Sequence, residues 1–266
     1  MQNAARQHHL TLNNLVQGAW GLLISCYSST SLTINSGEKD VVFGATVSGR
    51  QPVIDNIESM VGLLINTIPT RVKIDHQKQI LSWLQELQTQ AIEQEQYSYF
   101  PLAEIQQVSD ILPGMPLFES LLVFENYPVD SSKQDKEKTL DISHLSCFER
   151  TNYPLTIVIN PGSHLGGRFV YDTRSFDETT LVRMIGHFQT LLTRFAENLQ
   201  QNISQISLLS AAEEQELIIL ENHLENHQNQ ENINFCNKIK YSFMSNSDCE
   251  IILPMFLKYI SHDFYS

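Results

Sequence analysis

The chain has no excess of positive charge and no long apolar run. Its 266 residues include 17 Lys and Arg against 30 Asp and Glu, a formal net charge of −13. Nucleic acids and anionic membrane surfaces bind clustered cations, so we exclude both as partners. No apolar segment reaches the roughly 20 residues of a transmembrane helix. The amino terminus also lacks the basic and then apolar layout of a secretory signal, and we expect a cytoplasmic protein.

Patterns that hold metals or phosphates are missing as well. The four cysteines are not spaced as metal ligands, and neither Cys236 nor Cys249 has a second Cys or His at zinc-finger spacing. We expect reduced thiols, as is usual in the cytoplasm. There is no glycine-rich phosphate loop. The sequence therefore predicts that the chain holds no metal and binds no cofactor directly.

What is present is the composition of a globular protein, with 42% hydrophobic and 18% charged residues. Apolar residues recur every three or four positions over residues 11–27, which predicts a helix with Thr11 as its N-cap. The apolar run at 40–47 predicts a buried strand. Residues 65–74 predict a second strand, in which Pro69 marks an edge or a bulge because proline cannot donate to the ladder.

The remaining pattern alternates between helices and strands. We expect the aromatic cluster at 97–100 to belong to the core and the charged segment at 130–138 to be a loop. We expect the middle strands to form a mixed sheet covered by helices from both ends of the chain. The further predicted elements are a helical or irregular stretch at 57–64, helices at 79–96 and 102–108, strands at 118–124, 140–149, 155–160 and 167–172, a long helix capped by Asp177, and a helix opened by the capping box of Ser210 and Glu213.

Four stretches, in the family's order, resemble the second half of a condensation domain of nonribosomal peptide synthetases. They are TLNNLVQGAWGLLISCYS with DVVFGATVSGRQP, then SMVGLLINTIPTRV, EQYSYFPLAEIQ and FERTNYPLTIVI, the last with imperfect spacing. The residues that carry the likeness are Gly62, Asn66, Thr67 and Arg71 in the second stretch, Tyr99, Phe100, Pro101 and Leu102 in the third, and Arg150, Asn152, Pro154 and Leu155 in the fourth.

This resemblance implies an α/β fold, namely one subdomain of a chloramphenicol acetyltransferase-like αβ sandwich. It assigns residues 1–208 to the C-terminal half of a condensation domain. Residues 209–222 resemble a helical linker towards an adenylation domain, but the residues that would introduce that domain are missing. Asn and Gln dominate residues 222–237. We expect residues 223–266 to be an irregular, aberrant tail left by a frameshift or a premature stop.

His8 and His9 are one step from the family's catalytic signature HHxxxDG. In the family, that motif belongs to the first subdomain, where the second His lies over a tunnel and the Asp fixes the loop. Here Asn13 and Asn14 stand in place of the Asp and the Gly. The pair also comes only a few residues before a helix of the second subdomain. We therefore predict that both histidines are a decoy and that the chain lacks the catalytic motif.

The resemblance implies a role in amide bond formation between two aminoacyl or peptidyl thioesters. These thioesters ride on phosphopantetheine arms of carrier protein domains. The implied partners are those carrier domains and the missing N-terminal condensation subdomain. General acid–base help is worth about 10²–10⁴-fold in rate, so we expect this chain to be inactive by itself.

Six residues are candidates for lining the tunnel or positioning substrates: Ser48, Gly49, Arg50, Asn66, Thr67 and Arg71. Ser48 follows a buried strand and could donate to an oxyanion, or Ser48 and Gly49 could merely form a turn. Asn66 and Thr67 could orient substrate or bond to backbone. Arg50 and Arg71 could meet a phosphopantetheine phosphate or surface carboxylates. Gly62, Tyr99, Pro101, Asn152 and Pro154 are structural motif residues.

Three alternatives stay open. The chain could be a non-catalytic module that docks carrier proteins, or one half of a split synthetase. It could be a fragment of an epimerisation domain, although LLSAAEEQELI at 208–218 weighs against that. It could also be a non-functional remnant. In each case we expect an apolar patch where the two subdomains of a complete domain would meet.

Overall fold

The computed structural model of the chain describes residues 1–28, 34, 39–50, 54–112, 114–125, 151–162 and 164–225. The predicted strand at 140–149, the charged loop at 130–138 and Arg150 lie outside the described residues, as do three of the four cysteines and the tail from residue 226. None of the helices in the described ranges is long and apolar enough to span a membrane.

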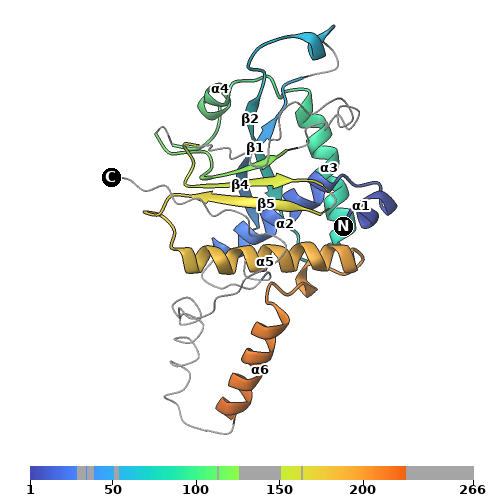
Figure 1. Cartoon of the computed structure of the whole chain (residues 1–266), viewed down its shortest axis with the longest axis vertical. Helices are drawn as coiled ribbons and strands as arrows, with labels where there is room; N and C mark the ends of the chain where they lie inside the picture. Colours follow the sequence, from blue (N-terminus) through green and yellow to red (C-terminus); the bar gives the residue numbers. More distant parts are fainter. Residues whose placement is uncertain are drawn as a thin grey trace, which may run out of the picture.

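A mixed five-stranded sheet forms the centre of the described fold, in the order β2-β1-β3-β4-β5 (Figure 1). The outer pairs β1–β2 and β4–β5 are antiparallel, and the inner pairs β1–β3 and β3–β4 are parallel. The predicted mixed sheet is therefore confirmed. Its strands are β1 (Asp40–Val47), β2 (Asn66–Lys73), β3 (Ser120–Phe124), β4 (Leu155–Asn160) and β5 (Gly166–Tyr171).

Strand β2 lies at the edge of the sheet, as the proline predicted. Pro69 is opposite Gly44 of β1, and its carbonyl accepts a hydrogen bond from the Gln94 side chain at 3.1 Å. The backbone polar groups of Pro69 thus face away from β1, and its missing N–H interrupts no ladder bond. Gln90 donates in the same way to the carbonyl of Arg71 at 2.8 Å. Two glutamine side chains of α3 (Ile80–Glu95) therefore cover part of this exposed edge.

Three long helices pack on one face of the sheet. Helix α2 (Leu12–Tyr27) lies against β1 and contacts both α3 and α5 (Glu178–Glu197). A Cβ atom on Gly18 would lie 2.4 Å from Cδ2 of Leu84, so glycine at this position lets α2 and α3 approach closely. The Thr11 hydroxyl accepts a hydrogen bond from Asn14 N, and the Asp177 carboxylate accepts one from Thr180 N. Both predicted N-caps are confirmed.

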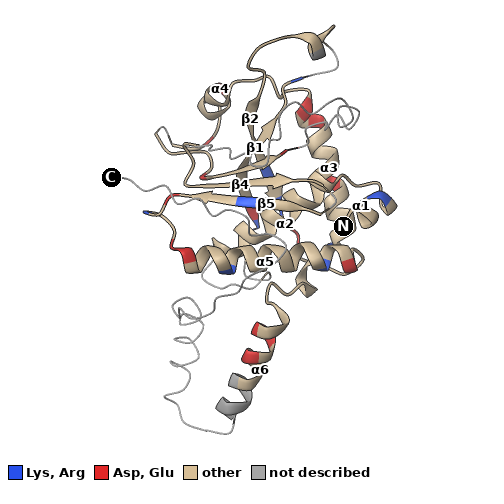
Figure 2. Cartoon of the chain, in the orientation of Figure 1, with Lys and Arg blue, Asp and Glu red and all other residues tan. Residues whose placement is uncertain are grey.

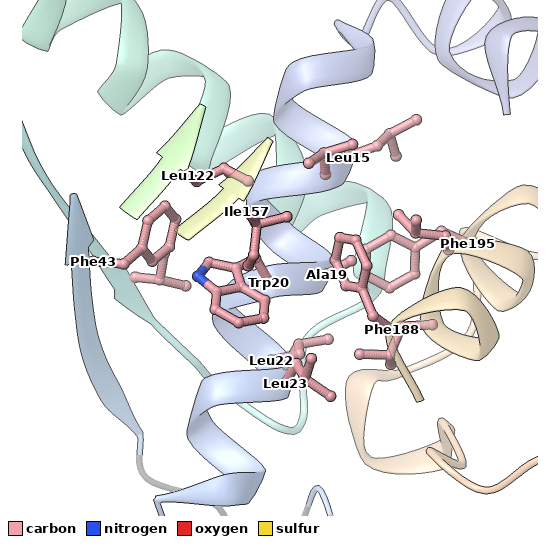
Figure 3. Close-up of a cluster of buried hydrophobic side chains, with 14 of the residues drawn as sticks. Leu15, Ala19, Trp20, Leu22, Leu23, Phe43, Leu122, Ile157, Phe188 and Phe195 are labelled. Atoms are coloured by element: carbon pink, nitrogen blue, oxygen red, sulfur yellow. The ribbon is translucent and has the colours of Figure 1, made fainter. Parts of the chain in front are cut away.

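Trp20 is at the centre of the core between the sheet and these helices. Its ring meets Phe188 of α5 edge-on at 5.9 Å and Phe169 of β5 at 6.3 Å. Figure 3 shows the same ring beside Phe43 and Ile157 of the sheet. All five side chains are buried. Edge-to-face packing of this kind adds about 0.5–1.5 kcal/mol per pair beyond the burial of apolar area.

Shorter elements complete the described chain. Helix α1 (Gln2–Gln7) was not predicted, because its six residues have no side-chain cap and only Ala5 is buried. Between residues 54 and 65, the described part of the stretch after β1 forms the 3-10 turn η2 (Ile57–Ser59). The other elements are α4 (Leu102–Gln107), the 3-10 turn η4 (Ile203–Gln205) and α6 (Ala211–Glu225).

Candidate functional site

The candidate site begins where β1 ends, at Ser48. This residue is exposed, and its hydroxyl oxygen accepts a hydrogen bond from the backbone N–H of Arg50 at 3.3 Å. Such a bond builds a local turn. A serine hydroxyl that accepts a bond still carries its own hydrogen. The Oγ–H of Ser48 is therefore chemically able to donate to a developing negative charge.

Gly49 forms the tightest point of this turn. Its φ angle is +66°, and a Cβ atom built on it would lie 1.8 Å from the carbonyl oxygen of Leu64. No other residue type fits, because the left-handed conformation and the close approach both exclude a side chain. Gly49 thereby brings the end of β1 against the segment that leads into β2.

Arg50 binds the same segment through hydrogen bonds from its side chain to backbone carbonyls. Its guanidinium donates through Nη1 to the carbonyl of Ile57 and through Nη2 to the carbonyl of Met60, the latter at 3.3 Å. Ile57 is the first residue of η2, and Met60 follows its last residue. Arg50 therefore spans from the turn after β1 to the far side of η2 and fixes that turn in place.

Asn66 is the first residue of β2, and its carboxamide is hydrogen-bonded through both its nitrogen and its oxygen. Nδ2 donates to the carbonyls of Ser98 and Phe100, each at 2.8 Å, and Oδ1 accepts from Thr67 N at 2.9 Å. Both amide hydrogens are thus used to join the start of β2 to the aromatic turn. Thr67 pairs with Thr46 of β1 across the ladder.

Arg71 lies at the opposite end of β2 from Asn66. It forms a two-pronged ion pair with Asp40, with Nε–Oδ1 at 2.9 Å and Nη2–Oδ2 at 2.6 Å. Hydrogen bonding by Arg71 holds the pKa of Asp40 below its usual value. Both side chains are about half exposed, and exposed pairs of this type contribute at most about 1 kcal/mol.

His8 and His9 form the turn between α1 and α2. His9 is exposed and has a φ angle of 55°, and its carbonyl accepts a hydrogen bond from Nε2 of Gln88 at 2.9 Å. Oε1 of Gln88 accepts from Thr11 N at 2.8 Å. Within the described ranges no carboxylate is bonded to either imidazole. The contact that shapes this turn comes from Gln88 on α3, which no sequence signal identified.

The structural motif residues do not gather at one end of the sheet. Tyr99 and Pro101 belong to or follow the turn that bonds Asn66, whereas Asn152 and Pro154 precede β4, which runs parallel to β1 through β3. Pro101 caps α4, and the carbonyl of Pro154 accepts from Asp172 N at 2.9 Å. Asn152 and Gly62 are exposed, and a Cβ atom on Gly62 would meet nothing within 4 Å.

The aromatic cluster at 97–100 is not in the core, which corrects our expectation. Tyr97 and Tyr99 are each 61% exposed, and Tyr99 stacks on Phe100 at 4.7 Å. Aromatic content alone does not predict burial, because burial depends on what covers the rings.

Exposed apolar side chains occur in two segments of the described chain, which we together call the apolar rim. It consists of six large side chains that are strongly exposed, three of them nearly completely. They come from the segment between β1 and β2, which projects beyond the sheet in Figure 1, and from the segment after α4. The residues of the apolar rim are Met60, Val61, Leu63, Ile65, Val108 and Leu112.

Residues 1–218 match the family model of the Condensation domain. The chain belongs to the condensation domain family. It is 41% identical over 219 residues to one of the linear gramicidin synthase proteins of Brevibacillus parabrevis, a match that covers 82% of this chain and 4% of that protein. It is 32% identical over 216 residues to surfactin synthase subunit 3 of Bacillus subtilis, a match that covers 80% of the chain and 16% of that protein.

Solved structures confirm the predicted α/β fold of the chloramphenicol acetyltransferase-like type. The chain superposes on the first condensation domain of the calcium-dependent antibiotic synthetase with a TM-score of 0.58 at 16% identity, covering 79% of the chain and 44% of that domain. It superposes on a four-domain nonribosomal peptide synthetase with a TM-score of 0.61 at 18% identity, covering 80% of the chain and 17% of that protein. The chain thus spans less than half of the solved condensation domain and a small share of the length of the synthase proteins.

Proposed function

We propose that residues 1–208 form the C-terminal subdomain of a condensation domain in a nonribosomal peptide synthetase. Residues 209–222 are then a linker towards a further domain, and residues 223–266 lie outside the condensation fold. In the complete domain, the amine of one carrier-bound aminoacyl thioester attacks the carbonyl of another carrier-bound thioester, and an amide forms. The phosphopantetheine arms belong to the carrier domains, and the chain binds no cofactor of its own.

The observation that carries this proposal is the apolar rim beside the Ser48 turn. Val61 is 103% exposed, Leu63 is 89% exposed and Val108 is 86% exposed. Single exposed apolar residues are common in soluble proteins, but a group of this kind marks a surface that another protein surface covers. The fold leaves this end of the sheet without a partner layer among the described residues. We assign the N-terminal condensation subdomain as the surface that covers it.

The catalytic imidazole comes from that other subdomain. The motif HHxxxDG does not occur in the 266 residues, and His8 and His9 form a backbone turn beside α3. The contribution of this chain is one wall of the reaction chamber. Ser48 supplies an oxyanion donor from that wall, and a donor of this kind is worth about 10²–10³-fold in rate. Gly49 and Arg50 fix the turn that presents it, while Asn66, Thr67 and Arg71 hold β2 beside it.

Reconstitution tests the proposal. The chain is mixed with the separately produced N-terminal condensation subdomain of the linear gramicidin synthase protein that it matches, and binding is measured by calorimetry. Amide formation from two loaded carrier domains is then followed by mass spectrometry. We expect no product from the chain alone and product from the mixture. Changing both His8 and His9 to Ala should alter neither binding nor rate.

Matched substitutions locate the contact. Leu63→Asp places a charge in the apolar rim and should weaken binding by about tenfold or more, since burying an unpaired charge is strongly unfavourable. Ile218→Asp changes an exposed apolar residue of α6, which lies outside the rim, and should leave binding unchanged. Amide synthesis by the chain alone would contradict the proposal. A carrier domain that binds the chain without the other subdomain would assign the docking-module function instead, and racemisation by the mixture would assign epimerisation.

A further inference from the structure

Helix α6 projects from the body of the protein, and its described side chains, residues 211–219, supply no apolar anchor to the core. It leaves the fold below α5 in Figure 1, and Figure 2 shows acidic residues along its first turns. None of the side chains of residues 211–219 is buried. The orientation of most helices in globular proteins is set by burial of an apolar face. The hydrogen bonds that join the described part of α6 to the core helices come from Glu213 and Glu214.

A partly buried chain of hydrogen bonds joins α6 to two core helices. The hydroxyl of Tyr27, the last residue of α2, lies 2.9 Å from Nδ1 of His187 on α5. Nε2 of His187 lies 3.2 Å from Oε1 of Glu213 on α6. The histidine is 1% exposed. A neutral imidazole satisfies both contacts, because Nδ1 accepts from the tyrosine hydroxyl while Nε2–H donates to the carboxylate.

Glu213 also forms the start of its own helix. Its Oε2 accepts from the backbone N–H of Ser210 at 2.8 Å and from the Ser210 hydroxyl at 2.7 Å, and Glu213 N donates to that hydroxyl oxygen at 3.3 Å. This confirms the predicted capping box. One carboxylate therefore begins α6 and ties it to the core at the same time. Any rotation of the helix start about Ser210 breaks the bond to His187.

The charge state of Glu213 fits this double role. Burial raises its pKa, but hydrogen bonds from His187 and Ser210 outweigh burial and lower the pKa to about 2. The carboxylate is thus ionised at neutral pH, and hydrogen bonds to ionised groups are about twice as strong as neutral ones. A second contact, Arg194 Nη2 to Glu214 Oε1 at 3.5 Å, is partly exposed and weaker.

We propose that Tyr27, His187 and Glu213 form a lock that sets the direction in which α6 leaves the condensation fold. When His187 no longer bonds Glu213, α6 stays helical but samples a range of directions relative to α5. If α6 is the linker of the proposed function, the lock also sets where the following domain is placed. That consequence rests on the proposed function, whereas the lock itself is a property of this chain.

Distance measurements between two spin labels test the lock in the full chain. The labels are attached at Glu93→Cys on α3 and Glu216→Cys on α6, both exposed positions, with the cysteines other than buried Cys26 changed to serine. His187→Phe keeps a ring in the core and removes both hydrogen bonds. Loss of a bond to a charged group should raise the detached population by about tenfold or more, seen as a broader distance distribution at unchanged helix content.

Two further variants separate the lock from helix capping. Ser210→Ala weakens the capping box and leaves the His187 bond, so its distribution should match that of the parent chain. Glu213→Ala removes the capping box and the bond to His187 together. Because Glu213 is partly exposed, this variant leaves the core intact and serves as the test if His187→Phe fails to fold. It should broaden the distribution well beyond Ser210→Ala. An unchanged distribution in Glu213→Ala, or equal broadening in Glu213→Ala and Ser210→Ala, overturns the lock.

Discussion

Replacing Gly49 by alanine should destabilise the chain more than any other exchange of this type near the candidate site. The residue has a φ angle of +66°, and the added Cβ would lie 1.8 Å from the carbonyl oxygen of Leu64. Contacts of Cβ atoms below 3.0 Å are essentially never found, so the two backbones must separate by about 1 Å. That separation pulls the turn after β1 away from the segment leading into β2.

Two terms determine the magnitude. The left-handed conformation costs about 1–2 kcal/mol for a residue with a side chain. Displacing packed backbone adds about 1–3 kcal/mol, as overpacking does in protein cores. The free energy of unfolding should therefore fall by about 3 kcal/mol. At about 2–4 °C per kcal/mol for a domain of this size, Tm should drop by roughly 6–12 °C.

Two other glycines provide matched controls for urea and thermal unfolding. Gly114 has a φ angle of +89° but nothing within 4 Å of an added Cβ, whereas Gly62 has neither a positive φ angle nor a close neighbour. Gly114→Ala should show the conformational term alone, about 1–2 kcal/mol. Gly62→Ala should change little or stabilise slightly through the unfolded state. If Gly49→Ala loses no more stability than Gly114→Ala, to within about 0.5 kcal/mol, the reasoning from close approach is refuted.

Three further predictions concern the core, a buried histidine and a helix cap. Trp20→Ala should lower the free energy of unfolding in urea by about 3–5 kcal/mol, because its ring packs on both the sheet and α5; a loss below about 1 kcal/mol would contradict this. Burial, aided by Lys39, lowers the pKa of His76 from 6.5, so the unfolded chain binds the proton more tightly. Stability should be full above pH 6.5 and decline as pH falls towards the folded pKa, and His76→Leu should flatten that part of the pH profile. Asp177→Ala should lower the free energy of unfolding by about 0.5–2 kcal/mol at about pH 7. Hydrogen bonds from Thr179 and Thr180 lower the pKa of Asp177 to about 2, so the difference in stability from the parent chain should vanish as pH falls from about 4 through 2. A stability difference that persists below about pH 2 would exclude this cap.

The helices and strands were predictable because each depends on a local pattern. The apolar period of residues 11–27 and the β-branched run at 40–47 depend only on neighbours along the chain, and both elements are found at the predicted positions. The caps at Thr11 and Asp177 are similarly local. Helix α1 was not predicted because it has no side-chain cap and because its six residues are too few to show an apolar periodicity.

The candidate site depended on contacts that no local pattern encodes. Asn66 donates hydrogen bonds to carbonyls 32 and 34 residues away. These bonds use both of its amide hydrogens to join β2 to the aromatic turn. Gln88 shapes the turn at His9 from 79 residues away. The resemblance to condensation domains identified Ser48 as a candidate, but only the fold shows that Gly49 presses the Ser48 turn against Leu64.

The amino-acid sequence by itself determined the family, the order of the elements and the absence of HHxxxDG, because these properties lie in residue identity and spacing. The tertiary structure alone decided which apolar side chains stay uncovered and how α6 is attached. Exposure depends on whether another layer of the fold reaches a side chain, and Tyr27 meets His187 across 160 residues of chain. Such proximity follows from the packing of α2 against α5, which no local segment specifies.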